Sequence, residues 1–213
     1  MIAPVATAAL LVAAPAAAVF GGAALVAAPA AGVFGGAALV AAPVVHDVYG
    51  VQVPESVTVG GRTLTVNGAG LRKKAFFKVY VASLYLEKAP DHDPASVVGS
   101  DQIKRVDMGM LRDLDRGKIA DAVREGFEKN SREQMPQLKE RLDRFIEQIP
   151  DLKEGQRLTI TYVPGQGTTV VVGDSEARTR IEGKDFADAL FRVWLGDDPV
   201  DSDLKEKMLG RYN

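Results

Sequence analysis

Few side chains in this 213-residue sequence could carry nucleophilic or metal chemistry. The sequence has no cysteine and only two histidines, His46 and His92. The lack of cysteine excludes disulfides, thiolate nucleophiles and iron–sulfur clusters, and two histidines leave little material for a catalytic triad. Asp91-His92-Asp93 looks like a metal-binding triplet, but adjacent ligands on a loop are a weak signal. We therefore expect a solvated loop at this triplet, no bound metal and no cofactor.

Two residues are candidates for ligand binding, Arg72 and Tyr80. Arg72 follows a predicted turn at 67–70 and begins a long apolar run, so its guanidinium could reach the end of a hydrophobic cavity and bind a carboxylate or phenolate. Tyr80 lies on the same face of that run. A straight strand would separate the two residues by about 26 Å, so their cooperation requires a bend or a bulge. The alternative to ligand binding is that Arg72 is a surface or structural arginine and that Tyr80 is a tyrosine of the core.

The pattern of apolar residues predicts strands, then helices, then strands, then helices. A hairpin is expected at 56–66 around Gly60-Gly61, because valine and leucine alternate there with polar residues. The run at 71–87 is apolar on both faces, which is typical of a single central strand covered on both sides. Pro136 should divide the helical region 115–149 into two helices or kink a single one. The remaining expected elements are strands at 104–111, 156–163, 168–172 and 178–181, a polar loop at 89–100, and helices at 185–195 and 201–209. This order predicts an α+β fold, an antiparallel sheet packed against a layer of helices.

Residues 1–46 carry no charged side chain and repeat with a period of 14, since the copies at 12–25 and 26–39 differ only at Ala18 versus Gly32. We interpret 1–46 as an apolar leader and 47–213 as one domain, which predicts a periplasmic or secreted protein. The leader has no basic residue at its start, and prolines interrupt it. A retained membrane anchor, a misassigned start or a disordered tail are therefore alternatives. No stable membrane insertion of the mature domain is expected.

The charge balance limits the partners. Lysine and arginine number 26 and aspartate and glutamate 28, a formal net charge of −2. This balance gives no field strong enough to predict nucleic acid or an anionic membrane surface as a partner. The charged helical region mixes both signs every few residues, which is typical of solvated helix faces.

Three segments together resemble the bacterial chalcone isomerase-like proteins: NGAGLRKKAFFKVYVASLYLE (67–87), YVPGQGT (162–168) and FADALFRVWLGDDPVDSDLKEKMLG (186–210). The resemblance covers about residues 50–211. It implies an open-faced β-sandwich, in which a large antiparallel sheet packs against helices with a ligand cleft between them. It also implies an ancestry shared with plant chalcone isomerases and plastid fatty-acid-binding proteins.

The resemblance also assigns residues. Arg72 matches the arginine that holds a substrate oxygen in the enzymes and a carboxylate in the fatty-acid-binding members, and Tyr80 falls near the tyrosine that assists it. Three polar positions of the isomerase fall near Ile119, Gly126 and Val193, none of which can position water or polarise a carbonyl. The implied pattern is a binding protein that keeps the anion-binding arginine without the catalytic network.

These observations lead to three hypotheses. The first is an exported domain, without catalytic activity, that binds a small amphipathic carboxylate such as a fatty acid through Arg72 and Tyr80. Its cleft would be lined by residues such as Phe77, Val79 and Leu190. The second is a chalcone isomerase-type intramolecular lyase acting on a polyketide-like ligand. The third is a structural or interaction module of the cell envelope.

Overall fold

The computed structural model describes residues 45–173, 175 and 180–212. Most of the predicted leader, residues 1–44, therefore lies outside the described residues. Strand β1 begins at Val45, close to the predicted domain boundary at 47. Among the helices that the structure describes, none has the length and apolar character needed to span a bilayer.

At the centre of the domain, the described residues form a sheet of seven strands in the order β3-β4-β5-β6-β7-β8-β9, each antiparallel to its neighbours. The strands follow one another in sequence, because short hairpin and loop connections favour antiparallel neighbours. Their bounds are β3 Ser56–Val59, β4 Arg62–Lys74, β5 Phe77–Leu86, β6 Lys104–Met110, β7 Arg157–Val163, β8 Gly167–Val172 and β9 Arg180–Ile181.

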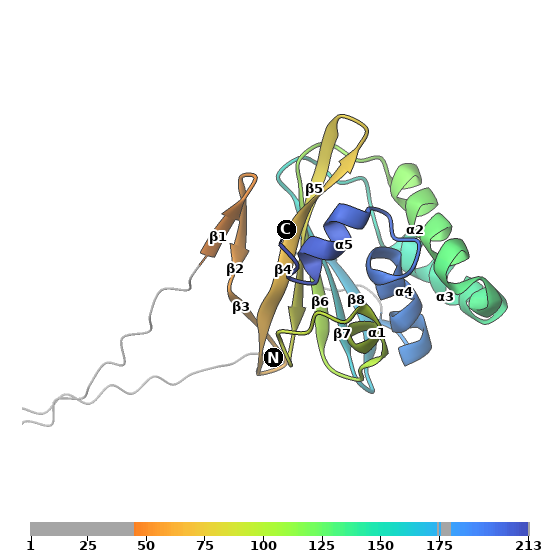
Figure 1. The fold of residues 1–213 in the computed structure, drawn as a ribbon. Coiled ribbons are helices and arrows are strands. Elements are labelled where there is room, and N and C mark those ends of the chain that lie inside the picture. The colour runs from red at the N-terminus through yellow and green to blue at the C-terminus, as the bar shows by residue number, and fades with distance from the viewer. Residues whose placement is uncertain (1–44, 174, 176–179, 213) are drawn as a thin grey trace, which may run out of the picture. The chain divides into compact units, whose positions relative to one another are not determined.

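The helices lie on one side of this sheet (Figure 1). They are α1 Pro94–Gly99, α2 Arg116–Ser131, a short 3-10 helix Arg132–Gln134, α3 Met135–Glu147, α4 Lys184–Leu195 and α5 Ser202–Met208. Pro136 lies in the first turn of α3, where its missing N–H costs no hydrogen bond, and this confirms the predicted division. The α+β fold predicted from the sequence, an antiparallel sheet against a layer of helices, is confirmed.

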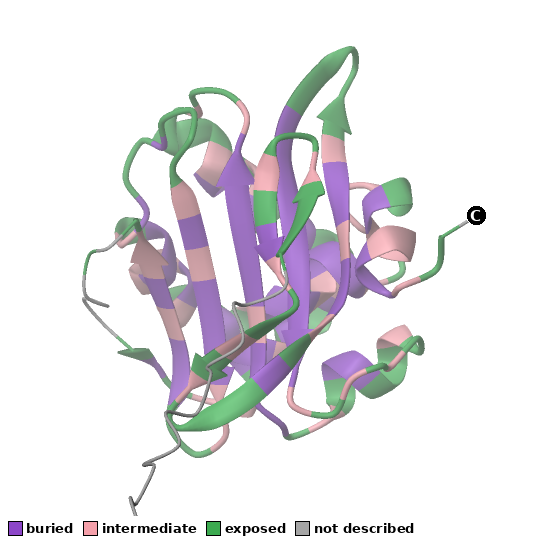
Figure 2. Cartoon of the chain, turned by 90° about the vertical axis from the view of Figure 1, so that its left-hand side faces the viewer, coloured by how far each residue is buried: buried purple, intermediate pink, exposed green. Residues whose placement is uncertain are grey.

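The opposite side of the sheet is covered by a small hairpin of β1 (Val45–Val48) and β2 (Val51–Pro54). A second, smaller core lies beneath it, where Val53 packs with Val81 and Tyr85 of β5. Strands β5 and β6 are accordingly buried along most of their length, whereas β4 is exposed at both of its ends (Figure 2). Strand β5 is thus covered on both faces, as its apolar pattern predicts.

The prediction of a single strand at 71–87 is wrong. The run folds back on itself as the β4–β5 hairpin, in which Lys74 pairs with Phe77 across a turn at Ala75 and Phe76. Ala75 has a φ of 52°, in the left-handed region that glycine or asparagine usually occupies in such turns. The turn therefore carries no local sequence signal, and the apolar run continues through it.

The predicted turn at 67–70 is also wrong, because these residues lie inside β4. Gly68 and Gly70 are needed for close packing of α5 on this strand. A Cβ at Gly68 would overlap the carbonyl oxygen of Lys207 and would lie 2.8 Å from that of Met208, and a Cβ at Gly70 would lie 2.5 Å from the Lys207 Cβ. The glycine pair therefore fixes where the last helix docks.

The predicted polar loop at 89–100 contains helix α1. Asp93 caps this helix, since its carboxylate accepts hydrogen bonds from the N–H groups of Ala95 and Ser96. The Nδ1 atom of His92 lies 2.6 Å from the carbonyl oxygen of Leu209. The Asp91 carboxylate accepts a hydrogen bond of 2.6 Å from the Ser96 hydroxyl. All three members of the Asp91-His92-Asp93 triplet thus have structural contacts, and no cluster of potential metal ligands occurs within the described ranges.

Candidate ligand-binding site

A cavity of about 320 Å³ lies between the sheet and the helices, within the usual range for small-molecule sites. Strands β4 to β7 form one wall and helices α2, α3 and α4 form the other. The cavity is lined by Arg72, Lys74, Phe77, Val79, Tyr80, Met108, Met110, Arg112, Asp113, Leu114, Lys118, Ile119, Ala122, Val123, Phe145, Ile149, Leu152, Leu158, Ile160, Val193, Trp194 and Val200.

The cavity has a charged mouth and an apolar interior. The exposed lining residues are Lys74, Phe77, Arg112, Asp113 and Lys118, and they mark its opening. The buried lining residues are methionine, aromatic and branched aliphatic side chains from both layers. Leu114 and Leu152 exchange two backbone hydrogen bonds, of 2.8 and 2.9 Å, which join the loops on the helix side of the cavity. This arrangement suits a molecule with an anionic head and an apolar body.

The structure brings Arg72 and Tyr80 together. They are direct partners in the β4–β5 hairpin, and the Arg72 guanidinium carbon lies 5.8 Å from the centre of the Tyr80 ring, a cation–π contact. The separation of about 26 Å expected for a straight strand is removed by the turn. Arg72 is half-buried, and its guanidinium has no hydrogen bond or ion pair with another described residue.

The Tyr80 hydroxyl is held by Trp194, which lies in α4, the helix expected at 185–195. The indole Nε1–H of Trp194 donates a hydrogen bond of 3.1 Å to the Tyr80 oxygen. Burial raises the pKa of Tyr80, while the charge of Arg72 and the bond from Trp194 oppose this rise. The phenol therefore stays protonated at neutral pH. Because the indole occupies the oxygen as an acceptor, the O–H remains available as a donor.

Three further cations surround the mouth, and none was singled out from the sequence. Lys74, Arg112 and Lys118 come from the end of β4, the loop after β6 and the first turn of α2. The Arg112 guanidinium carbon lies 4.7 Å from the centre of the Phe77 ring. Asp113 is the single carboxylate among the described lining residues, and it is paired with Lys153 at 2.9 Å. The mouth therefore attracts anions.

Apart from Lys118 at the mouth and the indole of Trp194, the described lining residues that come from helices are apolar. Ile119 and Val193 both line the cavity with aliphatic side chains. Gly126 lies behind Val193, because a Cβ there would come within 2.9 Å of that side chain. The predicted lining residues Phe77 and Val79 are confirmed, whereas Leu190 is fully buried in the core outside the cavity lining.

Sequence reasoning could have found Trp194 but not the other missed residues. Trp194 is the only tryptophan in the chain, and a buried indole N–H usually requires an acceptor. Arg112 and Lys118 belong to segments whose mixed charges look like any solvated surface. Their role follows only from the cavity that the tertiary structure places beside them.

Comparison with known proteins agrees with this fold. A family model described as chalcone isomerase-like matches residues 45–210. The chain is similar to the crystal structure of a fatty-acid binding protein from Arabidopsis thaliana, with a TM-score of 0.59 and 16% identity over 79% of this chain and 96% of that chain. No curated protein sequence matches. Because the family model spans nearly the whole described domain, the chain belongs to the chalcone isomerase-like family.

Proposed function

We propose that this domain binds a small amphipathic carboxylate, with a fatty acid as the ligand class, and does so without catalysing its conversion. The observation that carries the proposal is the Arg72 guanidinium, which lines an apolar cavity without an ion-pair partner in the described part of the chain and lies against Tyr80. A guanidinium binds a carboxylate through two parallel hydrogen bonds, and the protonated Tyr80 hydroxyl can donate a third.

The apolar interior would supply most of the affinity. Each buried methylene contributes about 0.8 kcal/mol, so an acyl chain of moderate length gains several kcal/mol by leaving water. Arg72 and Tyr80 would fix the position of the head group, which is the usual division of roles in such cavities. The fatty-acid binding protein of similar fold supports this ligand class.

An exported location belongs to the proposal. It is supported by the uncharged segment 1–46, whose apolar and small residues suit a secretory leader. A periplasmic or secreted binding protein would carry its ligand between membranes or from the medium.

The test compares a fatty acid with the fatty alcohol of equal length. The full chain is expressed with export, and binding is followed by the emission of Trp194, which lines the cavity and is the only tryptophan. Arg72→Ala should weaken fatty-acid binding about a hundredfold, because a hydrogen-bonded charge is lost, and should leave alcohol binding within about threefold. Exposed Arg132, outside the cavity lining, provides the matched control Arg132→Ala.

Equal fatty-acid affinity in wild type and Arg72→Ala, with both proteins folded, would refute the proposal. Native mass spectrometry adds a second readout, since a co-purifying carboxylate should be lost in Arg72→Ala. A protein that binds neither acid nor alcohol would point to a structural or interaction module.

A chalcone assay separates binding from lyase chemistry. Ring closure removes the long-wavelength absorbance of a chalcone, and general acid–base groups are needed to accelerate it. With Ile119 and Val193 on the helix side of the cavity, we expect no rate above the uncatalysed one. Turnover that depends on Arg72 would instead establish the lyase.

A further inference from the structure

The tip of the β4–β5 hairpin combines exposed aromatic rings with clustered cations. Phe76 is 100% exposed and Phe77 is 59% exposed, and both stand at the turn between the strands. Turn positions ordinarily carry glycine, asparagine, aspartate or proline, so two adjacent phenylalanines at an exposed tip are unusual. Nothing in the described structure covers the Phe76 ring.

Cations surround these rings. Lys73 and Lys74 precede the turn, Lys78 follows it, and Arg112 lies over the Phe77 ring. The ammonium group of Lys78 lies 5.0 Å from the ring centre of Tyr49, a residue 56% exposed in the turn of the neighbouring β1–β2 hairpin. Aromatic rings flanked by lysine and arginine are the combination that binds the interface of an anionic bilayer.

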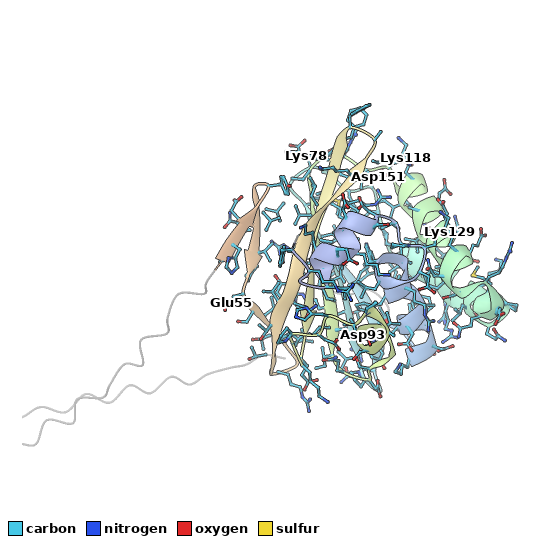
Figure 3. All side chains as sticks on the ribbon, in the orientation of Figure 1. Glu55, Lys78, Asp93, Lys118, Lys129 and Asp151 are labelled. Carbon is cyan, nitrogen blue, oxygen red and sulfur yellow. The ribbon has the colours of Figure 1, made fainter. Side chains whose placement is uncertain are left out.

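The nearby carboxylates are already engaged. Asp113 is paired with Lys153 and accepts the N–H of Glu154. Asp115 caps α2, and Asp151 accepts the N–H of Arg116. Lys78, Lys118 and Asp151 lie toward the same end of the molecule, whereas Glu55 and Asp93 lie toward the other end (Figure 3). Residues 73–78 and Arg112 together carry four cations and no carboxylate, a local excess that the net charge of −2 conceals.

We propose that this tip, defined as residues 73–78 with Tyr49 and Arg112, docks reversibly on the surface of an anionic membrane. Phe76 enters the head-group region and the cations contact lipid phosphates. Lys74, Phe77 and Arg112 belong both to the tip and to the mouth of the cavity, so docking places that mouth against the bilayer. The docking does not require a ligand and stands independently of the proposed function. Shallow contact of this kind is distinct from stable insertion.

The test uses the absence of cysteine in the chain. Ala75→Cys and Ala95→Cys, each in the full chain, are labelled with an environment-sensitive dye. Ala75 is in the tip, and exposed Ala95 is in α1. Vesicles of phosphatidylcholine with about one-third phosphatidylglycerol should shift the dye at 75 toward an apolar signal and leave the dye at 95 unchanged. Vesicles of pure phosphatidylcholine should give a much smaller shift of the dye at 75. High salt should weaken the shift that the anionic vesicles cause.

Two further substitutions, made in the Ala75→Cys protein, measure the contributions of the ring and the charge. Phe76→Ser should weaken vesicle affinity about tenfold, because the largest exposed apolar side chain is lost. Lys78→Gln should weaken it about fivefold, whereas Lys88→Gln, a matched exposed lysine beyond the other end of β5, should not. None of these three residues lines the cavity, so fatty-acid binding should be unchanged in all three variants.

The dye at position 75 reads the tip itself, so vesicle binding through the N-terminal segment alone would leave it unshifted and would overturn the proposal. Equal dye responses to anionic and neutral vesicles would also overturn it. Equal vesicle affinities of the Lys78→Gln and Lys88→Gln variants would overturn it as well. Failure of the proposed function is distinguishable, since Arg72→Ala would then leave fatty-acid binding unchanged whatever the dye reports.

Discussion

At the scale of single residues, the site depends on the chain of contacts from Arg72 through Tyr80 to Trp194. Arg72 lies against the face of the Tyr80 ring, and the indole of Trp194 donates to the Tyr80 hydroxyl. The ring orients the guanidinium and the indole orients the phenol. Two donor groups therefore converge on one place at the edge of an apolar cavity, which is the arrangement that a carboxylate requires.

The first residue-scale prediction concerns this phenol. Tyr80→Phe should weaken fatty-acid binding about tenfold and leave binding of the matching alcohol nearly unchanged, because it removes one hydrogen bond to a charged group. It should also destabilise the fold by about 1–3 kcal/mol, since the Trp194 N–H loses its buried acceptor. Fluorescence titration and chemical denaturation measure the two effects.

Tyr85→Phe is the matched control for this prediction. Tyr85 is a fully buried tyrosine of the same strand, but it packs in the core under the β1–β2 hairpin. Loss of the Tyr85 hydroxyl should leave the affinity for the fatty acid unaltered. Equal losses of affinity in the two variants would show that general packing, and not the Tyr80 hydroxyl, matters for binding.

At the scale of elements, the close docking of α5 on β4 fixes the edge of the site. Asp201 caps α5 and also accepts the backbone N–H of Lys73, so the start of this helix contacts the strand that carries Arg72. Asn67 joins the same strand to the end of α5 through a hydrogen bond of 3.0 Å to the Met208 carbonyl. The position of Arg72 therefore depends on a helix more than a hundred residues away.

Gly68→Ala should separate these two elements. Its Cβ would overlap backbone atoms of α5, which cannot move as a flexible side chain would, so we expect a loss of about 2–3 kcal/mol in the free energy of unfolding. Gly99→Ala is the control, because a Cβ there meets nothing within 4 Å and lies in a helix. Chemical denaturation of both variants measures the difference, and equal stabilities would contradict the packing role of Gly68.

At the scale of the whole molecule, one buried lysine connects the sheet to the helical layer. Lys104 of β6 is fully buried, and its ammonium group donates to the carbonyl oxygens of Val97, Val98 and Ser100 at the end of α1. It lies 3.6 Å from the Asp188 carboxylate of α4. Burial, only partly offset by Asp188, lowers the pKa of Lys104 from 10.5 to about 8.

This shift predicts a pH dependence of stability. Between about pH 8 and 10.5 the unfolded chain holds a proton on Lys104 that the folded protein has lost, so the free energy of unfolding rises with pH across this window. The rise amounts to about 3 kcal/mol for a shift of this size. Lys104→Met removes the titrating group and roughly keeps its volume. Denaturation at pH 7 to about 10 should show the wild-type curve rising relative to that of the variant, and parallel curves would contradict the shift.

The sequence by itself determined most of the local structure and the type of fold. Alternation predicted the 56–66 hairpin around Gly60-Gly61, and helical spacing predicted helices on either side of Pro136, because these patterns depend on neighbours a few residues apart. The same apolar pattern predicted that the strand carrying Tyr80 is covered on both faces. The motifs also indicated Arg72, through the resemblance to the family.

Only the tertiary structure decided how the site is assembled. The turn at Ala75 and Phe76 lacks the glycine or asparagine that would reveal it, so the sequence could not show that Arg72 faces Tyr80. Gly68 is read locally as a turn residue, whereas its function is to let a distant helix approach. The cavity mouth and the basic, aromatic tip join segments far apart in the chain. Contacts of this kind depend on strand register and layer packing, which no local pattern encodes.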